Sequence, residues 1–296
     1  MARASAIDLN WLRPLRLAAA GVLLAGIWPG ASALADSSAI LDRIRNDAEI
    51  RMAYRVDAAP FSYKENDVPA GYSVNLCLEV AAGLQRDMNL PKLKATFIQV
   101  TAENRFDALT QGEADILCEA TTATLSRRER VDFSVPTFVS GASLVILPDG
   151  PTSIDALGGR KIGVLGGTTT QQILEGTLRD RAINAEVVVV KTHDEGFEML
   201  EKGTISAYFG DRTILEDRLR RNSADRNLLL ADNYLTIEPY ALAMPIDHDF
   251  RLAVDRTLSR LFRSGGMIKV FRKSFAPEAK PSDLIKVLSR ISGLPE

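Results

Sequence analysis

Polar residues of complementary charge follow three short apolar runs of this chain, ADILC, KIGVL and ISAYF. The first loop carries Thr122 and Arg127, the second carries Thr168 and Thr169, and the third carries Asp211. Threonines at a helix start offer N–H groups and hydroxyls to an anion, and an arginine can hold a carboxylate through two hydrogen bonds. Asp211 offers the opposite charge, which an ammonium group needs. These residue types predict a site for a small molecule that carries both charges.

Three further residues, Arg55, Arg105 and His193, also follow or precede short apolar runs. Each candidate has a structural alternative: a threonine can simply cap a helix, Arg127 stands in a basic cluster, and His193 could be an exposed helix start. Arg55 and Arg105 could pair with surface carboxylates for little energy. The common placement of the candidates at strand ends favours a ligand site.

The two cysteines and two histidines limit other chemistry. Cys77 and Cys118 lack the close spacing of a zinc site, and only His193 and His248 could assist them. No Ser-His-Asp or Cys-His set is visible. The sequence therefore predicts no metal, no cofactor and no catalysis. In an oxidising compartment the two thiols would form a disulfide, the alternative being two separately buried thiols.

Composition sets the broad class of the protein. The chain has 296 residues, of which 46% are hydrophobic and 25% charged, as in globular proteins with room for two compact lobes. The formal net charge of -2 provides no basic field for nucleic acid, so a nucleic-acid partner is excluded.

The N-terminal segment has the order of a secretory signal peptide. Arg3, Arg13 and Arg16 precede the apolar run at residues 17 to 28, and small residues lead to Ala35. A membrane anchor is the alternative, but the run is shorter than the roughly 20 residues that a spanning helix needs. We therefore expect residues 1–35 to be removed and the mature protein to be exported.

From about residue 40, short strand-like runs alternate with amphipathic helical stretches, which predicts an α/β architecture with mostly parallel sheets. The second half repeats a sequence pattern of the first half. In both, an aromatic residue and a leucine lie one helical turn apart and are followed by a glycine and then by a strand. The correspondence joins Phe106, Leu109 and Gly112 to Phe197, Leu200 and Gly203. We interpret it as two lobes of similar design.

The chain is expected to cross twice between these lobes. Lobe 1 would comprise residues 36–146 and 240–296, because PYALAMP and the following helical stretch return to it, and lobe 2 would comprise residues 147–239. Two extended crossings form a hinge that can close around a ligand.

Several of these segments together resemble the extracellular solute-binding proteins of family 3, which serve ATP-driven transporters of polar amino acids. They are GYS before a helix, the run TTATLSRRERVDFSVPTF, GGTTT and the FGD turn, and the resemblance covers about residues 40 to 275. It implies a two-lobed periplasmic-binding-protein fold of type II, a monomer in the periplasm, an amino acid ligand and the permease of an ABC transporter as partner.

The resemblance also implies roles for the candidates. Thr122 and Arg127 match residues that hold the ligand α-carboxylate, with Thr168 and Thr169 adding contacts from lobe 2, and Asp211 matches the acceptor of the α-ammonium group. In the glutamate/aspartate-binding members, the positions of Arg55, Arg105 and His193 recognise a side-chain carboxylate. An acidic ligand is therefore expected.

Three residues depart from the pattern of those members. Glu119 and Ala120 replace a glycine and a serine, and Ala102 replaces a second serine. Two hydroxyl contacts are lost and a negative charge is added near the expected site, which affects specificity more than general function. Two rival functions remain: a dehydratase-like enzyme with Glu119 as acid or base, and a sensor that reports to a membrane receptor or kinase.

Overall fold

The computed structural model describes residues 38–221, 227–231 and 235–295. The predicted signal peptide, residues 1–35, lies outside them. Within the described ranges, no helix is long and apolar enough to cross a membrane.

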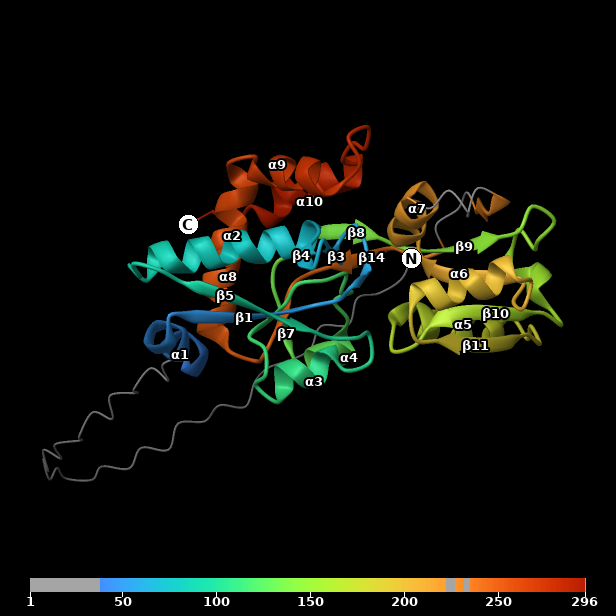
Figure 1. Cartoon of the computed structure of the whole chain (residues 1–296), viewed down its shortest axis with the longest axis horizontal. Coiled ribbons are helices and arrows are strands. Elements are labelled where there is room, and N and C mark those ends of the chain that lie inside the picture. Colours follow the sequence, from blue (N-terminus) through green and yellow to red (C-terminus); the bar gives the residue numbers. More distant parts are fainter. Residues whose placement is uncertain (1–37, 222–226, 232–234, 296) are drawn as a thin grey trace, which may run out of the picture. The chain divides into compact units, whose positions relative to one another are not determined.

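Two five-stranded sheets organise this part of the chain (Figure 1). The first has the order β5-β1-β6-β15-β7, formed by Lys94–Gln99, Glu49–Tyr54, Ile116–Leu117, Ala243–Met244 and Asp132–Phe133. The second has the order β11-β10-β12-β9-β13, formed by Glu186–Val190, Lys161–Leu165, Ala207–Asp211, Ala142–Ile146 and Leu229–Leu230. In each sheet the first three strands are parallel and the fourth runs antiparallel to them. The predicted α/β class with mostly parallel sheets is confirmed.

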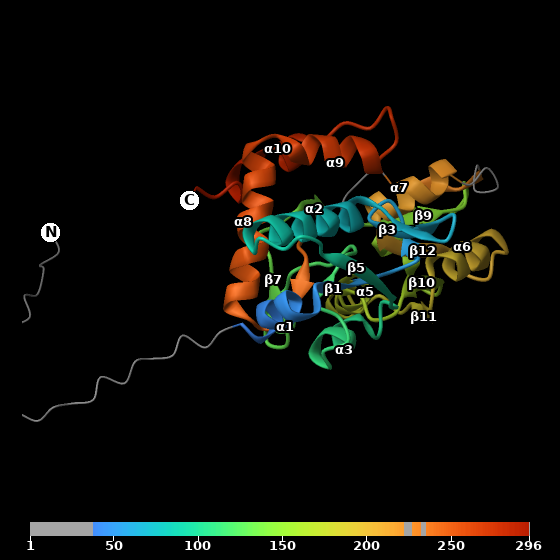
Figure 2. The same ribbon diagram turned by 60° about the vertical axis from the view of Figure 1, so that its left-hand side comes forward.

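Helices cover both sheets. Those around the first are α1 (Ala39–Asp47), α2 (Tyr72–Asp87), α3 (Arg105–Thr110), α4 (Leu125–Arg128), α8 (His248–Arg263), α9 (Gly266–Ser274) and α10 (Asp283–Ser292). Those around the second are α5 (Thr169–Asp180), α6 (His193–Glu201), α7 (Arg212–Arg221) and the short 3-10 helix η1 (Ile154–Leu157). Figure 2 shows α9 and α10 on the same side as α2, which packs against α8 and α9.

Apolar periodicity explains why these helices pack where they do. In α2, Leu76, Val80 and Leu84 recur at helical spacing and are buried against Ile50 and Met52, which alternate along β1. A glycine with positive φ follows both α3 and α6, at +71° for Gly112 and +68° for Gly203. Such a backbone favours glycine and ends the helix, so the two halves share the design that the sequence predicts.

Two short strands, which pair with each other, connect the two halves of the protein. β8 (Phe138–Ser140) lies between β7 and β9 in the chain, and it pairs antiparallel with β14 (Glu238–Tyr240), which lies between β13 and β15. The predicted lobe boundaries at residues 146 and 240 stay a prediction. Because β9 pairs with β12 of the second sheet, we propose that the first crossing is β8, a few residues earlier.

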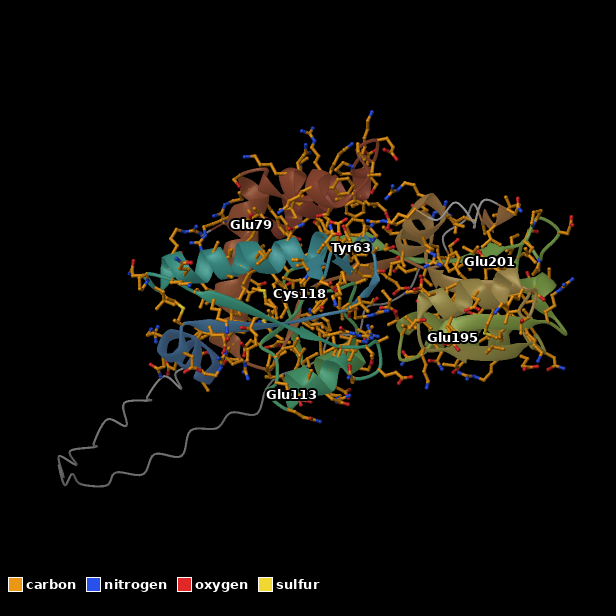
Figure 3. All side chains as sticks on the ribbon, in the orientation of Figure 1. Tyr63, Glu79, Glu113, Cys118, Glu195 and Glu201 are labelled. Atoms are coloured by element: carbon orange, nitrogen blue, oxygen red, sulfur yellow. A yellow bond between two sulfur atoms is a disulfide. The ribbon has the colours of Figure 1, made fainter. Side chains whose placement is uncertain are left out.

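A small sheet and a disulfide complete the first half. The small sheet consists of β2 (Asp57–Ala58), β3 (Ser62–Glu65) and β4 (Val68–Ala70). Cys77 in α2 is bonded to Cys118, which directly follows β6. Cys118 lies in the interior between α2 and the sheet (Figure 3). The disulfide thus ties the end of β6 to the helix that covers it.

Candidate ligand-binding site

The structure brings all eight predicted binding residues to the lining of one cavity. They are Arg55, Arg105, Thr122, Arg127, Thr168, Thr169, His193 and Asp211. Ala120, Glu238 and Tyr240 also line it. The roles predicted for the eight residues stay proposals, but their convergence is a property of the structure.

Parallel strands explain this convergence. Arg55 follows β1 and Thr122 lies in the loop after β6, its parallel neighbour; Thr168 lies in the loop after β10, and Asp211 ends β12, beside β10. Carboxyl ends of parallel strands meet at one edge of a sheet, where ligands of open α/β sheets bind. Both sheets therefore direct polar loops to the same cavity.

Arg127 and two threonines form one group in the cavity lining. Arg127 Nη1 donates to the Thr122 carbonyl oxygen at 2.8 Å, and its guanidinium lies 5.1 Å from the centre of the Phe106 ring. The Thr122 and Thr169 hydroxyl oxygens are 3.2 Å apart although they follow strands of different sheets. A fixed guanidinium can hold a carboxylate.

Glu238, in the crossing strand β14, was not predicted from the sequence. Both hydroxyls donate to its Oε2, that of Thr122 at 2.6 Å and that of Thr169 at 2.8 Å. Thr236 donates to its other oxygen at 2.9 Å. An acidic residue in the otherwise apolar crossing IEPYALAMP was the one available signal.

Thr168 has a structural role. Its hydroxyl accepts from the Gln171 backbone N–H at 3.1 Å and donates to the Leu165 carbonyl oxygen at 2.7 Å, so it caps α5. For this side chain the helix-cap alternative is correct. Any contact with a ligand would come from backbone N–H groups at the start of α5, which have no acceptor within the helix.

Asp211 is the predicted partner of an ammonium group. Its Oδ1 accepts from the Ser140 hydroxyl at 2.7 Å and from the Thr213 N–H at 3.1 Å. Burial, and next the charge of Glu238, raise the pKa of Asp211 to about 8. Without a ligand this carboxyl therefore keeps a proton at neutral pH, and a cation beside it would favour the charged form.

Arg55 and Arg105 also line the cavity and are almost fully buried. The guanidinium of Arg105 lies 4.8 Å from the centre of the Phe106 ring that Arg127 also contacts. Arg55 is paired with Asp57, with Nε at 2.9 Å and Nη2 at 2.8 Å from Oδ1, and its Nη1 lies 3.3 Å from Glu119. Arg105 Nε lies 3.1 Å from the same Glu119 carboxylate. Glu119 thus sits between the two guanidiniums that were expected to recognise a ligand carboxylate.

Arg105 also links the two halves. Its Nη1 donates to the Ala102 carbonyl oxygen, and its Nη2 donates to the Gly167 carbonyl oxygen at 3.2 Å. Ala102 is itself buried, and Ala120 lines the cavity, so the two alanines leave apolar methyl groups at positions where the sequence resemblance implies hydroxyls.

His193 is uncharged at neutral pH. Its Nδ1 lies 2.9 Å from the Tyr208 hydroxyl, and burial, followed by the charge of Arg55, lowers its pKa to about 4. Within the described part of the chain, three buried nitrogens of the cavity-lining residues lack a hydrogen-bond partner: Arg55 Nη2, Arg105 Nε and His193 Nε2. The two arginine atoms lie close to carboxylates but are not aligned for hydrogen bonds.

Two open sheets joined by two crossing strands and sharing one polar cavity define a two-lobed periplasmic-binding-protein fold of type II. The solved solute receptor for L-cysteine of Neisseria gonorrhoeae has this fold, with a TM-score of 0.72 at 23% identity over 82% of this chain and 98% of that one. The chain belongs to the bacterial extracellular solute-binding proteins, family 3, whose model matches residues 50–277.

Two curated relatives extend the comparison. The chain is 29% identical over 248 residues to the L-glutamate/L-aspartate-binding protein of Pseudomonas aeruginosa, covering 82% of each chain. It is 26% identical over 275 residues to the glutamate/aspartate import solute-binding protein of Escherichia coli, covering 92% of this chain and 91% of that one. The chain is thus a solute-binding protein of the kind that serves amino acid transporters.

Proposed function

We propose that this protein captures a free amino acid in the periplasm, as a monomer, and delivers it to the permease of an ABC transporter. The observation that carries the proposal is one cavity in which the guanidinium of Arg127 lies with the carboxyl group of Asp211. Such a set matches the opposite charges of an amino acid backbone. The proposed role is binding without catalysis.

The proposed mechanism is closure of two lobes. The ligand first docks on Arg127 and Thr122, and the second lobe then adds Thr169 and Asp211. A ligand shifts a conformational equilibrium by its higher affinity for one state, and only a closed state makes both sets of contacts. The 3.2 Å approach of the Thr122 and Thr169 hydroxyls supports this, because it brings loops of the two sheets together.

Some observations support an acidic side chain on the ligand, and one observation opposes it. An acidic ligand is supported by the presence of Arg55 and Arg105 in the cavity lining and by the names of the curated relatives. Against it stands Glu119, which already pairs with both arginines. We therefore propose glutamate and aspartate together with their uncharged amides as the first ligands to test.

The rival functions have less support. Glu119 is engaged by Arg55, Arg105 and the Thr121 hydroxyl, so it is placed as a counter-ion and not as a free acid or base. A sensor would use the same cavity and the same closure. Export would require the predicted signal peptide, and the word import in the name of the Escherichia coli relative supports transport.

A thermal-shift screen of residues 36–296 against the common L-amino acids tests the proposal. A ligand at 100 times its Kd stabilises the folded state by about 2.7 kcal/mol, which is a clear upward shift of the melting temperature. We expect such a shift with at least one polar amino acid. No shift with any of them would refute amino acid binding, and a shift with L-glutamate or L-aspartate alone would establish the acidic assignment.

A further inference from the structure

We propose that Glu119 is the specificity-determining residue of the cavity, because its carboxylate holds the two guanidiniums that a ligand's side-chain carboxylate would need. The ligand class is then an amino acid whose side chain is uncharged but bears a hydrogen-bonding oxygen, such as an amide. This inference rests on the proposed amino acid binding and specifies its ligand.

Several contacts fix the position of the Glu119 side chain. Its side chain is fully buried, with Oε2 3.3 Å from Arg55 Nη1 and Oε1 3.1 Å from Arg105 Nε. It directly follows Cys118, whose disulfide to Cys77 ties this point of the chain to α2. The Thr121 hydroxyl also donates to it. These contacts hold the carboxylate between the two arginines.

The charges next to Glu119 are already paired. Two buried cations, Arg55 and Arg105, face two carboxylates, Asp57 and Glu119, and His193 is neutral. The charge of Arg127 also acts on Glu119 and Arg105, but the proposed binding mode assigns Arg127 to the α-carboxylate of the ligand. A ligand carboxylate would bring a third negative charge into a closed space. A buried charge without its own partner is strongly unfavourable, so the balance selects against an acidic side chain.

One buried donor of the cavity still lacks an acceptor. His193 Nε2 is buried and has no hydrogen-bond partner among the residues that the structure describes. When the Tyr208 hydroxyl donates to His193 Nδ1, His193 Nε2 carries a proton and is a donor. Arg55 Nη2 and Arg105 Nε already lie 2.8 Å from Asp57 and 3.1 Å from Glu119. An amide or hydroxyl oxygen of a ligand can accept from His193 Nε2 without adding charge.

Glutamine and glutamate have nearly the same shape and differ in charge, so calorimetric titration of both isolates the charge effect. For the unmodified protein we expect a Kd for L-glutamine, or for L-asparagine, about tenfold or more below that for the matching acid. In Glu119→Gln, which keeps shape but removes charge, we expect the preference to move toward the acid by about tenfold or more.

Glu113→Gln is the matched control. It makes the same charge change at an exposed position just after α3 (Figure 3), outside the cavity, and should leave the ratio of the two Kd values unchanged. Glu119→Ser is a second variant that removes the carboxylate with less bulk. If neither Glu119 variant folds without ligand, rescue of its melting temperature by glutamate but not by glutamine would still support the assignment.

Two results would overturn the assignment. One is an unmodified protein that binds the acids as tightly as their amides or more tightly, which needs no variant. The other is an unchanged ratio in both Glu119 variants. If no amino acid binds the unmodified protein or any variant, the proposed function itself fails and this assignment fails with it, so the two failures are distinguishable.

Discussion

The guanidinium of Arg127 is held by the Thr122 carbonyl oxygen and lies over the Phe106 ring, which orients it toward the cavity it lines. Charged hydrogen bonds are worth about 1.5 to 3 kcal/mol each, so Arg127→Ala should weaken binding of every amino acid by about 100-fold or more. Titration calorimetry checks this. Arg128→Ala, an exposed neighbour outside the cavity, is the control, and equal affinities of the two variants would remove Arg127 from the site.

Asp211 should make binding depend on pH. Its pKa is about 8 in the fold and about 3.9 in an unfolded chain, so the stability it contributes to the ligand-free protein at low pH is lost as pH rises toward 8. An ammonium group favours the ionised carboxylate, so binding near pH 6.5 should release about one proton.

Calorimetry in two buffers of different ionisation enthalpy measures that proton release. The release should fall markedly at pH 9, where Asp211 is already ionised in the ligand-free protein. Binding enthalpies that do not depend on the buffer at pH 6.5 would contradict the predicted contact between Asp211 and the ammonium group.

At the scale of elements, the start of α2 depends on Gly71. Its φ is +124°, and a Cβ there would lie 2.3 Å from the Phe61 carbonyl oxygen. Backbone strain and the clash together should make Gly71→Ala less stable by roughly 3 kcal/mol or more. Gly112→Ala is the matched control, because Gly112 also has a positive φ but an added Cβ there would meet no atom. This variant should lower the free energy of unfolding by only about 1 kcal/mol. Urea denaturation measures both; equal losses would refute the steric argument.

At the scale of the whole molecule, the paired crossings β8 and β14 are the expected hinge. Ligand should bring the first sheet's helices closer to those of the second. Dyes on Glu113→Cys, after α3, and Glu201→Cys, at the end of α6, report this distance by energy transfer, since both positions are exposed (Figure 3). We expect transfer to rise with a bound amino acid and to stay constant when Arg127→Ala is added. Unchanged transfer at saturating ligand would contradict closure.

Local residue patterns were enough to predict many features of this fold from the sequence. Alternating Ile50 and Met52 indicate a strand, the helical spacing of Leu76, Val80 and Leu84 indicates α2, and glycines end two equivalent helices. Because loops at the carboxyl ends of parallel strands converge, the sequence also predicted that residues as distant as Arg55 and Asp211 would meet. Short-range periodicity and one topological rule suffice for these features.

Long-range pairing decided the rest. Every residue of β9 is buried, so its pattern does not say which sheet it joins, and only its pairing with β12 does. Glu238 accepts from a threonine 116 positions away, and Glu119 meets an arginine 64 positions away. The sequence by itself predicted the fold class and eight of the residues that meet in the cavity, but not Glu238. Which carboxylates neutralise which cations was decided by the tertiary structure, because such pairs depend on distances that no local pattern encodes.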